Sequence, residues 1–149
     1  MTGAPLPFFQ TLPQQIWAIY VLSAVAFAFW RGGGPERVVA VAAVVASIAS
    51  ALLVNQRDWL SPQWGDLIVD LAFLGLLGYL AFATDRKWTL WATAFQLISV
   101  VIYVARMVDP RVGARAPYRA IVIWSYLIIA ALAVGTWLHW RRQARESVA

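Results

Sequence analysis

The sequence predicts an all-α integral membrane protein, built as a bundle of five transmembrane helices in a single membrane domain that covers residues 1–149. The first observation behind this prediction is composition, because 62% of the residues are hydrophobic and only 13% are charged. Soluble domains are about 45–50% apolar and about one quarter charged. The second observation is spacing, since charged residues divide the chain into apolar stretches of about 20 residues, the length at which a helix crosses the hydrocarbon core.

The first two predicted spans cover about 14–30 and 38–54. No charged residue precedes Arg31, and Pro13 marks the start of the first span. We expect this segment to be kept as a helix rather than cleaved as a signal peptide, because no cationic stretch comes before it. Three glycines and Pro35 separate the two spans, since glycine loses much backbone entropy in a helix and proline lacks the N–H donor.

The other three spans are predicted at about 67–84, 88–107 and 120–140. The segment 59–65 holds two tryptophans and a proline and separates the second span from the third. The third and fourth spans are joined by the tight link Thr84–Lys87, and the longest loop covers 109–117. Outside the spans we expect a short N-terminal tail at 1–13 and a short basic C-terminal tail at 141–149.

Lysine and arginine favour the cytoplasmic side of a membrane, so their positions predict the orientation of the chain. With the N-terminus outside, seven cations are cytoplasmic and five are external. The cytoplasmic set is Arg31, Arg37, Arg86, Lys87, Arg141, Arg142 and Arg145. The external set is Arg57, Arg106, Arg111, Arg115 and Arg119. We therefore expect an external N-terminus and a cytoplasmic C-terminus.

An interfacial polar cluster is predicted where the third, fourth and fifth spans reach the outer face. Because the third and fourth spans are antiparallel, one layer collects the residues Asp66, Asp70, Tyr103, Arg106 and Arg119. We expect Asp70 to pair with Arg106 or Arg119 and to accept a hydrogen bond from Tyr103. Such a pair is either a structural clamp or a site for an ion, a proton or a headgroup. The free N–H groups at the start of a helix also favour acidic residues there.

Gln96 is the polar residue nearest the middle of the fourth span, and Ser99 follows it on the same helix. An amide at this depth needs an interhelical partner. We expect that partner to be Ser47, Ser50 or Ser125, or a group on a neighbouring subunit.

Small residues indicate where helices approach closely, because helix association in lipid depends on packing rather than on water exclusion. In the second span they recur at four-residue spacing as Ala42, Ala46 and Ser50, and as Ala43, Ser47 and Ala51. The third span has Gly75 and Gly78, and the fifth has Ala131 and Gly135. We expect a neighbouring backbone to lie against each of these sets.

Two further sets of residues have alternative interpretations. We expect Arg111 and Arg115 to contact an anionic partner or a lipid headgroup, or to be neutralised locally by Asp58, Asp66 and Asp109. His139, the single histidine, anchors a helix at the interface beside two tryptophans, or, as a minor alternative, ligates a metal-centred pigment axially. No metal site is predicted otherwise.

Several classes of chemistry are excluded by what the composition lacks. No cysteine is present, which excludes disulfides, thiolate zinc sites and iron–sulfur ligation. The single lysine, Lys87, lies in a link, which excludes a retinal Schiff base within a span. No phosphate-binding loop or nucleophile elbow occurs. No cofactor is expected, although bound lipid or pigment stays open, and the cationic excess is assigned to topology and anionic lipid rather than to nucleic acid.

The function that these features favour is that of a non-catalytic accessory, assembly or stabilising subunit of a larger membrane complex. Its partners would be the lipid bilayer and other membrane-protein subunits, or further copies of itself. The alternative is a small oligomeric transporter or channel for an ion, proton or small solute, with a polar site around Asp70. A membrane enzyme that acts on lipid is a third interpretation, and no residue is assigned a catalytic role.

Overall fold

A computed structural model describes residues 12–53, 64–108 and 115–147, apart from the side chains at positions 13, 14, 106 and 115–121. The described residues form five α-helices. In chain order they are α1 (Leu12–Arg31), α2 (Gly34–Leu53), α3 (Trp64–Ala83), α4 (Lys87–Val108) and α5 (Arg115–Glu146). The predicted all-α fold is confirmed for this part of the chain.

Several helix ends lie beyond the predicted spans. α2 begins at Gly34 rather than at residue 38, because a proline is tolerated in the first turn, where the missing N–H has no helical partner. α5 covers 32 residues and ends at Glu146, so most of the predicted basic tail at 141–149 continues the helix. The physical reason is that charges end an apolar span without ending a helix, since arginine and glutamate are good helix formers.

Four of the helices are long and apolar enough to cross a membrane. The qualifying stretches are Gly34–Leu53, Trp64–Ala83, Lys87–Ala105 and Val122–Glu146. They correspond to the second, third, fourth and fifth predicted spans. In α1 the stretch Gln15–Arg31 is also apolar but is shorter.

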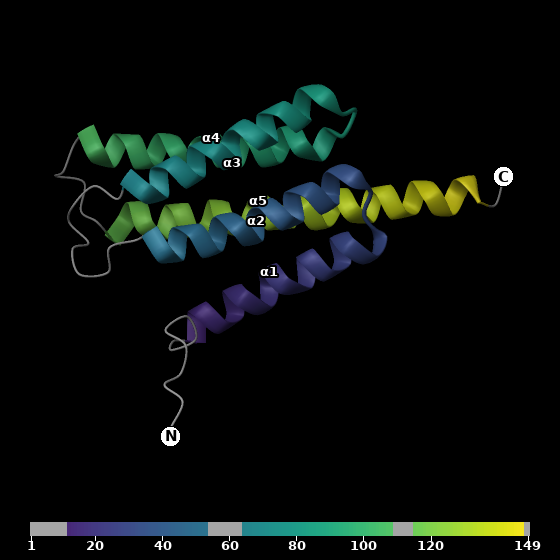
Figure 1. Ribbon diagram of the computed structural model, residues 1–149, viewed down its shortest axis with the longest axis horizontal. Helices are drawn as coiled ribbons and strands as arrows, with labels where there is room; N and C mark the ends of the chain where they lie inside the picture. The colour runs from purple at the N-terminus through teal and green to yellow at the C-terminus, as the bar shows by residue number, and fades with distance from the viewer. Residues whose placement is uncertain (1–11, 54–63, 109–114, 148–149) are drawn as a thin grey trace, which may run out of the picture.

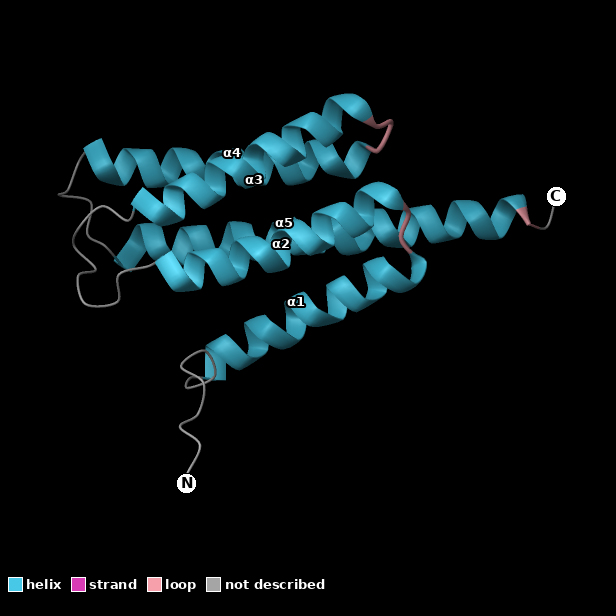
Figure 2. Cartoon of the chain, in the orientation of Figure 1, coloured by secondary structure: helices cyan, strands magenta, loops and turns pink. Residues whose placement is uncertain are grey.

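The helices form two antiparallel hairpins that are joined side by side and completed by α5. α1 pairs with α2, α3 pairs with α4, and α2 lies against α3 (Figure 1). α5 packs most extensively on α4 and also contacts α1 and α2. The links 32–33 and 84–86 lie at one end of the bundle, where α5 extends past the other helices (Figure 2). We call this the C-terminal end of the bundle.

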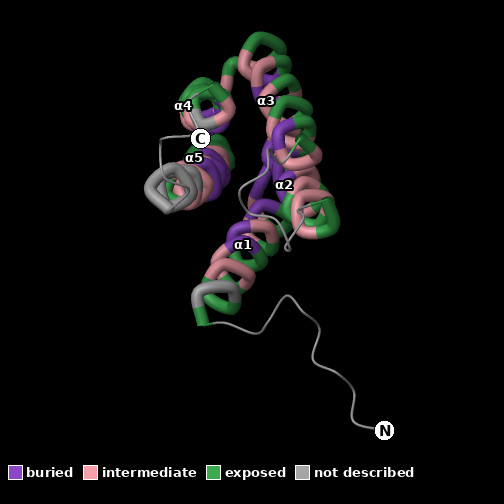
Figure 3. Tube along the Cα trace, turned by 90° about the vertical axis from the view of Figure 1, so that its left-hand side faces the viewer, coloured by how far each residue is buried: buried purple, intermediate pink, exposed green. Residues whose placement is uncertain are grey.

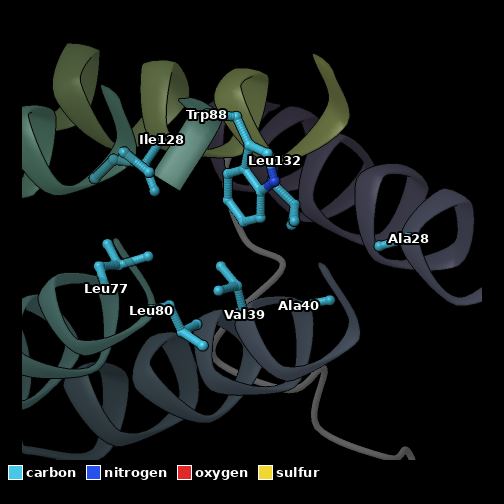
Figure 4. Close-up of a cluster of buried hydrophobic side chains, with 9 residues drawn as sticks. Ala28, Val39, Ala40, Leu77, Leu80, Trp88, Ile128 and Leu132 are labelled. Carbon is cyan, nitrogen blue, oxygen red and sulfur yellow. The ribbon is translucent and has the colours of Figure 1, made fainter. Parts of the chain in front are cut away.

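The main core is a cluster of buried apolar side chains to which all five helices contribute. Its members are Ala28, Val39, Ala40, Leu77, Leu80, Trp88, Ala92, Ile128 and Leu132 (Figure 4). Buried positions follow the sides of the helices that face one another, while the outward sides are exposed (Figure 3). The exposed positions include many large apolar side chains, as expected for a surface that faces lipid rather than water.

Two smaller buried clusters each join two or three of the helices. Val21, Ala24, Ala43 and Ile129 bring together α1, α2 and α5. Leu67, Val100 and Tyr103 join α3 to α4 near the end of the bundle opposite the C-terminal end. The small Ala43 therefore packs against neighbours as predicted, whereas Ser47 is exposed and donates its hydroxyl to the Ala43 carbonyl at 2.8 Å.

The glycines of α3 and α5 differ in what surrounds them. A Cβ added at Gly135 would lie 2.4 Å from Cγ of Trp88, so this glycine is needed for the close approach of α4 to α5. The predicted packing role of Gly135 is confirmed. A Cβ added at Gly75 or Gly78 would meet no atom within 4 Å. The prediction that these two glycines admit a neighbouring backbone is therefore wrong within the chain, because the α3 surface that carries them faces outward.

We expect Gly135→Ala to lower the free energy of unfolding by about 1–3 kcal/mol, since the new methyl group overlaps the Trp88 ring and the packed core cannot make room freely. The measurement is thermal unfolding in mild detergent, followed by tryptophan fluorescence. Gly75→Ala is the matched control and should leave the melting temperature unchanged or slightly higher, because alanine is the better helix former. Equal effects of the two substitutions would contradict the assigned α4–α5 contact.

Candidate functional site

The first candidate site is built around Glu36, whose side chain is fully buried in the first turn of α2. The Gly33 N–H donates to Glu36 Oε2 at 3.1 Å, and the Arg37 N–H donates to the Gly33 carbonyl at 3.2 Å. This is the arrangement in which the third residue of a helix reaches back to cap its first free N–H groups. The short link between α1 and α2 thus places a carboxylate inside the bundle.

The second oxygen of this carboxylate is shared between two other segments. The Trp88 indole N–H of α4 donates to Glu36 Oε1 at 3.0 Å. Arg86, in the link between α3 and α4, places its Nη1 atom 3.7 Å from the same oxygen. Buried charge is tolerated only when it is paired and hydrogen-bonded, and here an indole, a guanidinium and a backbone amide meet that requirement. We call Gly33, Glu36, Arg86, Trp88 and His139 the Glu36 cluster.

His139 connects α5 to the Glu36 cluster through Arg86. The Arg86 Nη1 and His139 Nδ1 atoms are 2.8 Å apart. Because a guanidinium only donates, Nδ1 accepts, which assigns the ring proton of neutral His139 to Nε2. A Cβ added at Gly33 would lie 3.0 Å from this Nε2 atom. The imidazole therefore packs directly on the α1–α2 link. Both roles predicted for it, anchoring at the membrane interface and axial ligation of a pigment, stay predictions.

The second candidate site joins Asp70 of α3 to Gln96 of α4. The Gln96 Nε2 group donates to Asp70 Oδ1 at 3.0 Å and lies 3.2 Å from the Asp70 carbonyl oxygen. Gln96 and Ser99 are almost completely buried, whereas Asp70 is half-buried. Tyr103 is buried nearby in the cluster with Leu67 and Val100. Asp70, Gln96, Ser99 and Tyr103 are called the Asp70 cluster below.

Gln96 and Asp70 were both singled out by the sequence, but not as partners of one another. The Gln96 amide donates to Asp70, which was not among the partners predicted for it, namely a serine or a group on a neighbouring subunit. α3 begins at Trp64 instead of residue 67, so Asp70 is six residues, or about 9 Å, into the helix. This depth brings Asp70 within reach of a residue near the middle of α4.

The remaining predicted site residues divide into two groups. Asp66 is half-buried in the first turn of α3, one turn before Asp70. The side chains of four arginines lie outside the described residues, namely Arg106, Arg111, Arg115 and Arg119. The predicted pairing of Asp70 with Arg106 or Arg119, and the predicted anion contact of Arg111 and Arg115, therefore stay predictions.

A row of polar side chains follows the inward face of α4 from the level of the Glu36 cluster into the Asp70 cluster. Its members are Thr89, Thr93, Gln96, Ser99 and Tyr103, at spacings of three or four residues. The hydroxyls of Thr89, Thr93 and Ser99 donate to carbonyls of their own chain segment three or four residues earlier. Throughout the described part of the chain, no buried side-chain nitrogen or oxygen atom lacks a hydrogen-bond partner. Both clusters and the row between them are thus internally satisfied.

The Glu36 cluster is the feature that sequence reasoning missed. Glu36 follows Gly33 by three residues, which is the position of the returning carboxylate in a helix-capping motif. That signal predicts the bond to Gly33, and it does not predict Arg86, Trp88 or His139, because these partners come from three other segments.

Comparison with known proteins found no matching family model, no similar curated protein and no similar solved structure. The function of the chain is therefore inferred from its own residues and their geometry.

We expect Glu36→Ala to lower the free energy of unfolding by about 3–5 kcal/mol, because it leaves Arg86 without its counter-ion and two buried N–H groups without an acceptor. Glu36→Gln should have a smaller effect, since the amide oxygen still accepts one hydrogen bond. Thermal unfolding in detergent provides the measurement. The control is Glu146→Ala at the exposed end of α5, which should change stability by less than about 0.5 kcal/mol. A Glu36→Ala variant as stable as the control would refute the role of the cluster.

Proposed function

We propose that the chain is an integral membrane protein in which all five helices cross the bilayer, with the N-terminus outside and the C-terminus in the cytoplasm. The apolar lengths of α2 to α5 support insertion. The C-terminal end of the bundle, counted as its two links, the helix ends that adjoin them and the last turns of α5, carries seven of the twelve lysine and arginine residues, which supports a cytoplasmic location for that end.

Within that membrane the protein acts by association, as a non-catalytic accessory, assembly or stabilising subunit of a larger complex. Its buried polar side chains support this proposal, because each described one already has a hydrogen-bond partner within the chain. Glu36 binds groups from two other segments besides its own, and Gln96 ties α4 to α3. These two side chains therefore fix the relative positions of the helices that they join.

The observation that carries the proposal is the outward position of Gly75. Glycine costs about 1 kcal/mol relative to alanine inside a helix, and an added Cβ here would meet nothing within the chain. Ile68 and Leu71, on the same helix, are exposed apolar neighbours of this outer surface. In lipid a small residue on an apolar helix surface allows the backbone of another protein to approach closely. A partner helix packed against α3 would give Gly75 a packing role, which it does not have in the isolated chain.

We expect purification in mild detergent, followed by mass spectrometry, to recover a stoichiometric membrane-protein partner with the wild-type chain. Gly75→Leu should reduce recovery about tenfold, equivalent to about 1.4 kcal/mol of lost helix packing, while the thermal stability of the chain itself is kept. Ala94→Leu provides the matched control, because Ala94 is an exposed small residue on α4.

A chain that purifies only as a homo-oligomer would contradict the subunit proposal and favour the second candidate, a small transporter or channel. The polar row on α4 is the observation that supports this alternative, because it places polar side chains at three- or four-residue spacing from the level of the Glu36 cluster to the level of Asp70. Reconstituted wild-type protein would then carry ion or proton flux across vesicles, and Asp70→Asn would abolish it.

The proposed orientation can be measured cleanly because the native chain contains no cysteine. We expect a Ser147→Cys variant in whole cells to resist a membrane-impermeant maleimide, whereas a Gln56→Cys variant in the α2–α3 connection should be labelled. The reverse pattern of labelling would show that the chain is inserted the other way round.

A further inference from the structure

The C-terminal end of the bundle carries much more positive than negative charge. Seven cations lie there, against three acidic residues, Glu36, Asp85 and Glu146. One of the three, Glu36, is fully buried and paired with Arg86, which leaves six cations against Asp85 and Glu146 at this end. The exposed surface at this end therefore attracts anions.

The last turns of α5 concentrate this charge on one helix face. Arg141, Arg142 and Arg145 follow Leu138 at three, four and seven residues, which places all four side chains on the same side of the helix. Together they line a shallow, open hollow of about 120 Å³. Three guanidinium groups line this hollow, and the guanidinium group is a paired N–H donor that binds phosphate oxygens well.

Tryptophan rings fix the positions of two arginines at this level. The Arg141 guanidinium lies 4.7 Å from the centre of the Trp137 ring. The Arg31 guanidinium lies between two rings, 4.5 Å from the centre of Trp30 and 5.0 Å from that of Trp140. Tryptophan is enriched at headgroup depth, and a guanidinium that stacks on a ring keeps its N–H edge available. The rings therefore indicate the depth of the hollow relative to the bilayer.

The hollow continues into apolar surface toward the middle of α5. Val134 precedes Leu138 by one turn on the same face, and these side chains are 50% and 42% exposed. α5 is about 48 Å long at 1.5 Å per residue, whereas the hydrocarbon core is about 30 Å thick. Its last turns therefore extend past the apolar layer, as their projection beyond the other helices also indicates (Figure 1). An anion with an attached hydrocarbon chain fits a cationic surface that is followed by an apolar surface better than a free anion does.

We propose that the last turns of α5 bind an anionic phospholipid, with its phosphodiester against Arg141, Arg142 and Arg145 and an acyl chain along Leu138 and Val134. This inference rests on the proposed membrane insertion and is independent of the proposed association with a partner. The basic end of α5 would then bind a lipid in addition to its effect on the orientation of the chain in the membrane.

The test measures lipid binding to detergent-solubilised full-length protein by native mass spectrometry, with phosphatidylglycerol and phosphatidylcholine as the two probes. We expect phosphatidylglycerol to bind at least about tenfold more tightly. The double variant Arg142→Gln, Arg145→Gln should weaken phosphatidylglycerol binding about 30-fold, given the contribution of each cation near a lipid headgroup. Arg37→Gln is the matched control, because Arg37 is exposed at the same end of the bundle but does not line the hollow.

Three results would overturn the proposal. The two lipids could bind equally, Arg37→Gln could weaken binding as much as the double variant, or inorganic phosphate at equal concentration could displace phosphatidylglycerol completely. The first result would show that binding does not depend on the charge of the lipid headgroup. The second would show that the hollow is not the binding site, and the third that the ligand is a free anion. Recovery of a protein partner by the same variants is scored separately, so failure of the association proposal would not be confused with these outcomes.

Discussion

The buried carboxylate of Glu36 is the constraint on which the arrangement of the helices depends. A charge without contact to water must be surrounded by donors, and here the donors come from the α1–α2 link, from the α3–α4 link and from α4. Arg86 then extends the network to His139 of α5. One side chain thereby fixes the relative positions of two hairpins and the final helix at one end of the bundle.

This constraint has particular force in a chain of such apolar composition. Helices in lipid gain little from burying apolar side chains against each other, so polar contacts and close packing decide which surfaces meet. The Glu36 cluster and the approach of Gly135 to the Trp88 ring act together, because Trp88 contributes both the buried indole donor and the surface against which α5 packs. Farther along the bundle, the bond from Gln96 to Asp70 fastens α3 to α4.

The distribution of these contacts also relates the proposed function to the fold. The polar side chains described in the interior are hydrogen-bonded within the chain, and those of Glu36 and Gln96 join helices. The outer surface is apolar and includes glycine positions on α3 with no neighbour within the chain. The surface still available for binding another molecule is therefore the outer surface of the bundle. At the C-terminal end the outer surface changes from apolar to cationic, because arginines that stack on tryptophan rings follow directly after exposed apolar side chains.

The sequence by itself determined the helical class, the approximate positions of the helices and the residues worth attention in the Asp70 cluster. These follow from local signals: apolar length, the glycines and prolines between spans, and polar residues too deep to reach water. It did not determine the pairing of Asp70 with Gln96, because the relative depth of two antiparallel helices depends on where each one begins and how they tilt. Nor did it reveal the role of Glu36, which in the sequence is an ordinary acidic residue at the start of a helix. Its importance comes from Arg86 and Trp88, which bind the carboxylate, and from His139, which binds Arg86; only the tertiary structure brings these three segments together.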